Sequence, residues 1–289
     1  MITASEIMTK QSAVTVLVVL TTLVMAIVIG YVSWRLVRSK VQTHKIIKTP
    51  RRLFDNPALK IPSYKIPETR TGQEFAVSMW VYLADFQPTA LGKPILMRGG
   101  SGNGGDRFQG TSPVVFLDAG SNKMYICART NRQTSSGGFV EPTSLMDIVS
   151  IPKNSNPYVV MVVDYVPMQR WVHIVFSVQD YLLTVYMDGS IYAVENLIDG
   201  SYASTEASAG GGGRPMFAGC TGEFVIGSPG ENAGADMRGF VSNTAFMNYA
   251  PLLDQVTSIY KTGPGSNSVL SMLGLDQYGV RSPVYKIGE

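Results

Sequence analysis

The chain has 289 residues, of which 16% are charged, and a formal net charge of +3, which argues against a nucleic-acid-binding protein and excludes a strongly basic one. Its two cysteines, Cys127 and Cys220, exclude a disulfide-rich secreted scaffold and leave open whether the two pair.

A long apolar segment without charged side chains at residues 11–34 follows a short N-terminal tail at residues 1–10. About 20 apolar residues span the hydrocarbon core of a bilayer, so the segment predicts one transmembrane helix. The alternative is a cleaved signal peptide, which needs a more basic start, a shorter apolar run and a small-residue cleavage site. The length of the run and its Tyr-Val-Ser-Trp-Arg ending favour a retained single-pass anchor.

Basic residues gather directly after this segment, whereas Lys10 alone precedes it. The positive-inside rule therefore predicts an outside N-terminus and a cytosolic C-terminal domain. The basic residues at 35–52 are either a topology signal alone or also a contact for anionic membrane lipids. The predicted membrane-interface residues are Tyr31, Trp34, Arg35, Arg38 and Lys40.

Residues 35–72 form a basic juxtamembrane stretch that continues into a proline-rich segment. Proline disfavours the helix interior and biases the preceding residue toward extended structure. We therefore expect a semi-rigid extended arm that lifts the folded domain off the membrane or lies along a neighbouring protein. The prolines that carry this prediction are Pro50, Pro57, Pro62 and Pro67.

Short runs of alternating apolar residues between turn residues predict an all-β domain at residues 73–262. The run 158–164 is apolar up to its final residue, Asp164, and is expected at the centre of a sheet. Residues 252–260 have helical spacing. Asp188-Gly189 predicts a hairpin turn. The predicted strands are 75–83, 94–98, 114–118, 123–129, 158–164, 171–178, 182–187, 191–195, 223–227 and 238–246.

Side chains of residues 171–178 alternate between two faces. Trp171 and His173 share one face, and Val172 and Ile174 point to the other. We expect Trp171 and Trp80 to be core aromatics and His173 to be a structural residue rather than a base or ligand.

A strand with Trp-x-His, a polar turn and a strand ending in Tyr-x-Asp-Gly resembles the central hairpin of laminin-G-like, concanavalin A-like jelly rolls. FAVSMWVYL, KPILMRG, PVVFLDAGSNKMYI and GEFVIGSPG resemble other strands of that family in order and spacing. The resemblance implies a β-sandwich jelly roll that binds or holds other molecules. The inserts 99–112, 132–156 and 199–220 depart from the family pattern and are expected to form the contact surface.

Catalytic chemistry is not indicated. Glycosidases of this fold use paired carboxylates, and no such run occurs, so no catalytic or cofactor-binding residue is predicted and the chain is expected not to be an enzyme. Laminin-G-like domains often bind calcium through loop carboxylates, which makes Asp118, Asp164 and Asp236 candidate ligands. The alternative for each is a turn-capping role.

A tail at residues 263–289 is expected to fold back on the domain or to reach a neighbour by strand addition. With the anchor and arm, it predicts a structural protein that tethers a membrane to neighbouring structural proteins. This arrangement resembles the membrane-anchored minor capsid proteins of large icosahedral DNA viruses, which link an inner membrane to the capsid shell of the virion. The alternative is a membrane-bound lectin-like module that binds carbohydrate or mediates adhesion.

Overall fold

The computed structural model describes residues 15, 17–33, 43–53, 58–67, 74–88, 92–99, 110–131, 140–153, 155–198, 216–219, 221–227 and 238–265. Its contacts divide the chain into two units, Met1–Gln42 and Thr43–Glu289.

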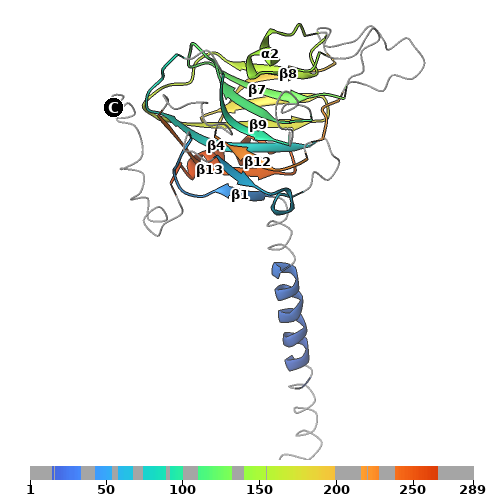
Figure 1. Ribbon diagram of the computed structural model, residues 1–289. Coiled ribbons are helices and arrows are strands. Elements are labelled where there is room, and N and C mark those ends of the chain that lie inside the picture. Colours follow the sequence, from blue (N-terminus) through green and yellow to red (C-terminus); the bar gives the residue numbers. More distant parts are fainter. Residues whose placement is uncertain are drawn as a thin grey trace, which may run out of the picture. The chain divides into compact units, whose positions relative to one another are not determined.

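The first unit contains an α-helix at residues 17–33, drawn in blue in Figure 1. Its large apolar side chains are exposed on every side, from 47% at Val32 to 63% at Ile27. The hydroxyls of Thr21 and Thr22 donate to main-chain carbonyls of the preceding turn, including that of Val18, so both are satisfied within the helix. Among the described residues, no helix combines the length and the apolar character needed to cross a membrane.

The second unit contains two antiparallel sheets that pack face to face (Figure 1), which confirms the predicted β-sandwich. We call the seven-stranded sheet, of order β1-β13-β4-β9-β10-β11 with β2 also paired to β13, sheet A. Sheet B has six strands in the order β3-β12-β5-β6-β7-β8. Sheet A comprises β1 (Thr43–Ile47), β2 (Arg51–Arg52), β4 (Phe75–Leu83), β9 (Trp171–Gln179), β10 (Leu182–Met187), β11 (Ser190–Asn196) and β13 (Gly239–Met247); sheet B comprises β3 (Leu59–Ile61), β5 (Lys93–Arg98), β6 (Val114–Leu117), β7 (Met124–Arg129), β8 (Tyr158–Val163) and β12 (Phe224–Ile226).

Strand β9 shows how the sequence pattern becomes packing. Val172, Ile174 and Phe176 point into the core between the sheets, as their alternation predicts. The opposite face of the strand is also withdrawn from water, because His173 and Val175 are fully buried. Sheet A is therefore covered on both faces.

Two helices cover the outer faces of the sandwich. α3 (Leu253–Lys261) lies on sheet A, where Val256 packs against Val175 and Tyr186. α2 (Leu145–Ser150) lies on sheet B, where Leu145 and Ile148 join a second apolar cluster. The sequence predicted α3 and missed α2, which begins at a capping box formed by the side chains of Ser144 and Asp147. The β-sheet residues of the α2 cluster are Met97, Val114, Phe116, Tyr125, Cys127 and Tyr158.

Part of the insert at residues 132–156 therefore packs on the chain's own sheet B. Arg129 of β7 forms a two-pronged ion pair with Glu141, just before α2, with one N–O distance of 2.9 Å. The described part of this insert, which was expected to contact a partner, instead contacts sheet B of its own domain.

Strand β8 forms the edge of sheet B, so its predicted place at the centre of a sheet is wrong. The strand is apolar on both sides because one side faces the core through Val159 and Val163 and the other lies beside α2. An edge strand covered by a helix has the same all-apolar sequence as a central strand.

The proline-rich arm adds strands to both sheets, which differs from the predicted extended arm. β1 and β2 pair with β13 of sheet A, and β3 pairs with β12 of sheet B. The arm's isolated apolar residues explain this, because they fill the core along one edge. Gly227 (φ 89°) allows the close approach of the Leu53 carbonyl, where a Cβ would collide. The buried arm residues are Ile47, Leu53, Ile61 and Ile66.

Replacing Leu53 should show that the arm is part of the core. The side chain is 1% exposed, so Leu53→Ala should lower the free energy of unfolding by about 2–5 kcal/mol. Arg52→Ala, at the exposed neighbouring residue, is the control and should change it by about 0.5 kcal/mol or less. Urea unfolding of the full chain in mild detergent, followed by near-UV circular dichroism, measures both. Equal stability of the two variants would contradict the arm's place in the core.

Candidate functional site

The described candidate calcium ligands each have a structural partner. Asp118 accepts a hydrogen bond from the Ser121 hydroxyl at 2.6 Å in the turn between β6 and β7. Asp164 lies 3.8 Å from the Lys123 ammonium. Asp236 lies outside the described residues. Within the described ranges, no three His, Cys, Asp or Glu side chains gather in a way that would hold a metal ion.

Of the predicted membrane-interface residues, Tyr31 lies on the N-terminal helix and is 59% exposed. Trp34, Arg35, Arg38 and Lys40 lie outside the described residues.

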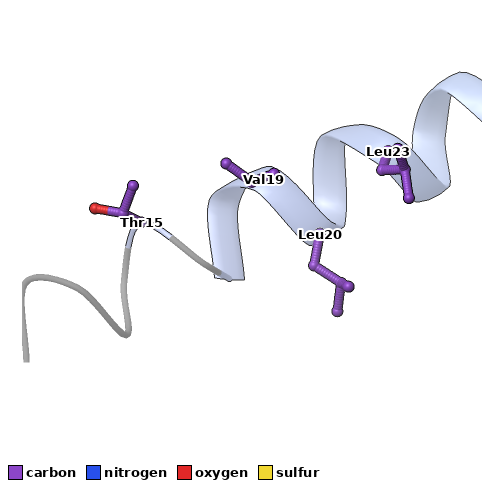
Figure 2. Close-up of a pocket in the computed structure, with 4 residues that line it drawn as sticks. All are labelled: Thr15, Val19, Leu20 and Leu23. Atoms are coloured by element: carbon purple, nitrogen blue, oxygen red, sulfur yellow. The ribbon is translucent and has the colours of Figure 1, made fainter.

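Figure 2 shows an open apolar hollow on the same helix. Three of its lining residues come from this helix and the fourth, Thr15, precedes it, so the hollow is an open furrow between side chains. These residues are Thr15, Val19, Leu20 and Leu23.

His173 is fully buried beneath α3, on the outer face of sheet A. Its Nε2 lies 2.9 Å from the Ser78 hydroxyl, and its ring packs against those of Trp80 and Tyr260, at centroid distances of 4.9 and 5.8 Å. Burial lowers the pKa of His173 to about 3, so the ring is neutral near neutral pH. No described residue forms a hydrogen bond with Nδ1. The Ser–His contact therefore lacks both solvent access and an orienting carboxylate, and the predicted structural role is supported.

Asp188 has more contacts than the predicted turn requires. The turn itself is confirmed, with φ of 50° at Asp188 and 83° at Gly189. The Asp188 carboxylate also accepts the main-chain N–H of His173 and pairs with Arg170, each at 2.9 Å. These contacts tie the hairpin turn to the start of β9. A turn motif in the sequence carries no signal for them.

Cys127 is a free, buried thiol in the cluster beneath α2. Burial raises its pKa, which keeps it protonated and unreactive. Cys220 lies outside the described residues.

Three half-buried aromatic side chains lie in register across the outer face of sheet A. Tyr82 of β4 pairs with Trp171 of β9 on one side and with Phe240 of β13 on the other. Ring centroids are 5.5 Å apart for Tyr82–Trp171 and 6.2 Å apart for Tyr82–Phe240. We call these three residues the aromatic row. The sequence predicted Trp80 and Trp171 as core aromatics. Trp80 is buried, beneath α3, whereas Trp171 is only half-buried and lies in this row.

No protein-family model and no curated protein matches the chain. Among solved structures, a mutant of HCR/D is similar with a TM-score of 0.47 and 8% identity, over 76% of this chain and 45% of that one. The receptor binding domain of botulinum neurotoxin D has a TM-score of 0.45 and 8% identity, over 76% and 47%. Trypanosoma rangeli sialidase has a TM-score of 0.37 and 15% identity, over 68% and 24%. The chain spans less than half of each of these structures, and the sandwich assignment rests on its own two sheets.

The burial of His173 predicts an acid-sensitive domain. Below pH about 6.5 the unfolded state binds a proton that the native state excludes until pH falls to about 3. The free energy of unfolding should therefore decrease as the pH falls through this window, by up to about 1.4 kcal/mol per pH unit. Urea unfolding at several pH values between about 7 and 5, above most carboxylate titrations, measures the slope.

His173→Gln should lower stability at neutral pH, through lost ring contacts, but should flatten this slope. His44→Gln, at the other histidine, is the control and should leave most of the slope in place. The prediction fails if His173→Gln keeps the dependence of the parent chain.

Proposed function

We propose that the chain is a non-enzymatic, membrane-anchored protein whose β-sandwich binds a partner at the membrane surface. The observation that carries this proposal is the helix at residues 17–33, with apolar side chains exposed on all sides and threonine hydroxyls satisfied internally. Such a surface is unfavourable in water and is suited to lipid.

A bilayer anchor sets a length requirement. Seventeen helical residues rise about 25 Å, whereas the hydrocarbon core is about 30 Å thick. The proposal therefore requires a helix of about 20 residues within the apolar segment 11–34. The basic residues after that segment support a cytosolic sandwich.

The buried reactive groups support a binding role rather than catalysis. His173 and the Cys127 thiol are enclosed under different helices, on the outer faces of different sheets. Neither is accessible to a substrate, and each is explained by packing.

The sequence resemblance supports a more specific fold and role for the chain. The fold would be a concanavalin A-like jelly roll, and the role would be to tether an inner membrane to a protein shell, as in minor capsid proteins of large icosahedral DNA viruses. A sandwich held at the membrane by one end, with its far parts free to contact a lattice, suits that role. The partner would then be a neighbouring structural protein.

Membrane extraction with a topology assay tests the proposal. The full chain, tagged at both ends, should remain in membranes after alkaline carbonate treatment because its apolar helix is covered by lipid. In sealed vesicles, protease added on the cytosolic side should remove the C-terminal tag and spare the N-terminal one. Release by carbonate would overturn the anchor. Protection of the C-terminal tag would overturn the cytosolic orientation while leaving the anchor in place.

Carbohydrate binding is a second candidate, favoured by the aromatic row. Side-by-side rings on a sheet face present flat apolar surfaces, against which the apolar faces of sugar rings stack. Trp171 and Tyr82 are half-buried, so each is held in place and still reaches solvent.

Trp171→Ala tests the second candidate. If the row binds sugar, this substitution should weaken binding to any glycan captured by the parent chain roughly tenfold or more, because the largest ring of the row is lost. Tyr165→Ala, at a 59% exposed aromatic outside the row, is the control and should leave binding unchanged. Glycan-array screening followed by calorimetry measures the effect. Absence of glycan binding by the parent chain rejects this candidate.

A further inference from the structure

One edge of the sandwich is built by the arm and carries exposed cations from both sheets. β1 and β2 supply cations beside sheet A, and β3 with the 3-10 turn Ser63–Lys65 supplies them beside sheet B. We call these six exposed residues the basic strip: Lys45, Lys48, Arg51, Arg52, Lys60 and Lys65.

Within the described part of the chain, no carboxylate forms an ion pair with the strip. Four ion pairs occur among the described residues, and none includes a residue of the strip. The positive charge of the strip also acts on His44 of β1. The pKa of His44 is lowered first by burial and then by the charges of Lys65 and Lys48. Lys48 and Lys65 therefore both lie near His44, although 17 residues separate the two lysines in sequence.

The opposite edge differs in charge. There, β8 and β11 end the two sheets, and the carboxylates of Asp164, directly after β8, and of Glu195, on β11, pair with lysines. Lys123 lies 3.8 Å from Asp164, and Lys153 lies 3.5 Å from Glu195. Six exposed cations therefore gather at the arm edge, whereas two lysines at the opposite edge are paired with carboxylates.

We infer that the basic strip is a docking surface for an anionic membrane leaflet, which orients the sandwich with its arm edge against the lipid headgroups. This inference rests on the proposed membrane anchor. Clustered Lys and Arg attract anionic headgroups. The strip begins at Lys45, eleven residues after the apolar segment ends at Trp34, so it is the part of the sandwich that the sequence keeps nearest to the anchor.

Tyr64 adds a second feature suited to a lipid interface. Its ring is 81% exposed at the tip of the 3-10 turn, and the Lys65 ammonium lies 5.9 Å from the ring centroid. Tyrosine is enriched at the headgroup level of membranes because its ring is apolar and its hydroxyl is polar. An exposed tyrosine among exposed lysines is therefore suited to a lipid headgroup layer.

A fluorescent probe at the strip tests the inference in the full chain. The environment-sensitive dye NBD is attached to Ser63→Cys in a Cys220→Ser background, where the buried Cys127 stays unlabelled. The chain is reconstituted into phosphatidylcholine vesicles, with or without phosphatidylserine, that contain brominated quencher lipids. Quenching should increase when phosphatidylserine is present and should fall at high salt.

Matched charge removals separate the two edges. Lys48→Gln with Lys65→Gln should lower the ratio of docked to undocked sandwich about fivefold per charge, or roughly 25-fold for the pair. Lys123→Gln with Lys153→Gln removes the same net charge from the opposite edge and should leave the ratio unchanged.

Flotation of the chain with pure phosphatidylcholine vesicles reports the anchor independently. If the chain does not float, the proposed function fails. If it floats but the probe shows no dependence on phosphatidylserine, the docking surface is overturned and the anchor stands. Protection of the probe by added duplex nucleic acid, without quenching by anionic vesicles, overturns the lipid assignment in favour of a nucleic-acid surface.

Discussion

Each sheet of the sandwich carries buried side chains on both faces, and the rest of the architecture depends on this constraint. A two-layer sandwich buries one face of each sheet and leaves the other wet. Here Trp80, His173 and Val175 on the outer face of sheet A, and Phe116 and Cys127 on that of sheet B, are buried as well. Two further layers are therefore required, and α3 and α2 supply them. The two short helices are therefore needed to bury these outer-face side chains.

This constraint decides where the domain has surface left for a partner. Helices occupy much of both outer faces, so the remaining surface consists of the edges, the loops and the uncovered end of sheet A. The aromatic row lies at that uncovered end, two residues along the strands from the row of Trp80, His173 and Ser242. Next to the second row, the segment after α3 is held by a hydrogen bond that the Ser242 hydroxyl donates to the Pro264 carbonyl. Recognition by this protein is thus expected at rims rather than at a central cleft.

The sequence predicted the strands of the domain well because alternation is a local signal. Residues 75–83 and 182–187 were predicted with the bounds that the structure has, and most other strands within one residue at each end. The single helix expected at 252–260 corresponds to α3. The Asp188-Gly189 turn was identified from a two-residue motif whose backbone demands are well known.

The failures concern partners that are distant in sequence. The apolar run Tyr158–Val163 has buried side chains on both faces, and its sequence does not show whether strands pair with one of its edges or with both. An edge strand was therefore predicted as a central one. The arm was read from its prolines, yet Leu53 and Ile61 are held by β13, β12 and the core, which lie far along the chain. Two of the six residues of the basic strip were missed for the same reason: Lys60 and Lys65 join the other four only after the arm has crossed from one sheet to the other.

The two edges of the sandwich protect their unpaired backbone N–H and C=O groups in different ways. The domain therefore presents two chemically different edges. At the arm edge, short strands with unpaired lysines and arginines discourage pairing with another chain while attracting anions. At the far edge, β11 exposes Ile191 and Val194 at 53% and 50%, but a bulge places Tyr192 out of register and lets its hydroxyl accept from the Asp164 N–H of the other sheet. That bulge bends the edge away from regular strand addition. A partner at the far edge must therefore recognise exposed apolar side chains, because the contact between Tyr192 and Asp164 and the bulge in β11 oppose strand addition. A sandwich docked by its basic edge would present this far edge away from the membrane.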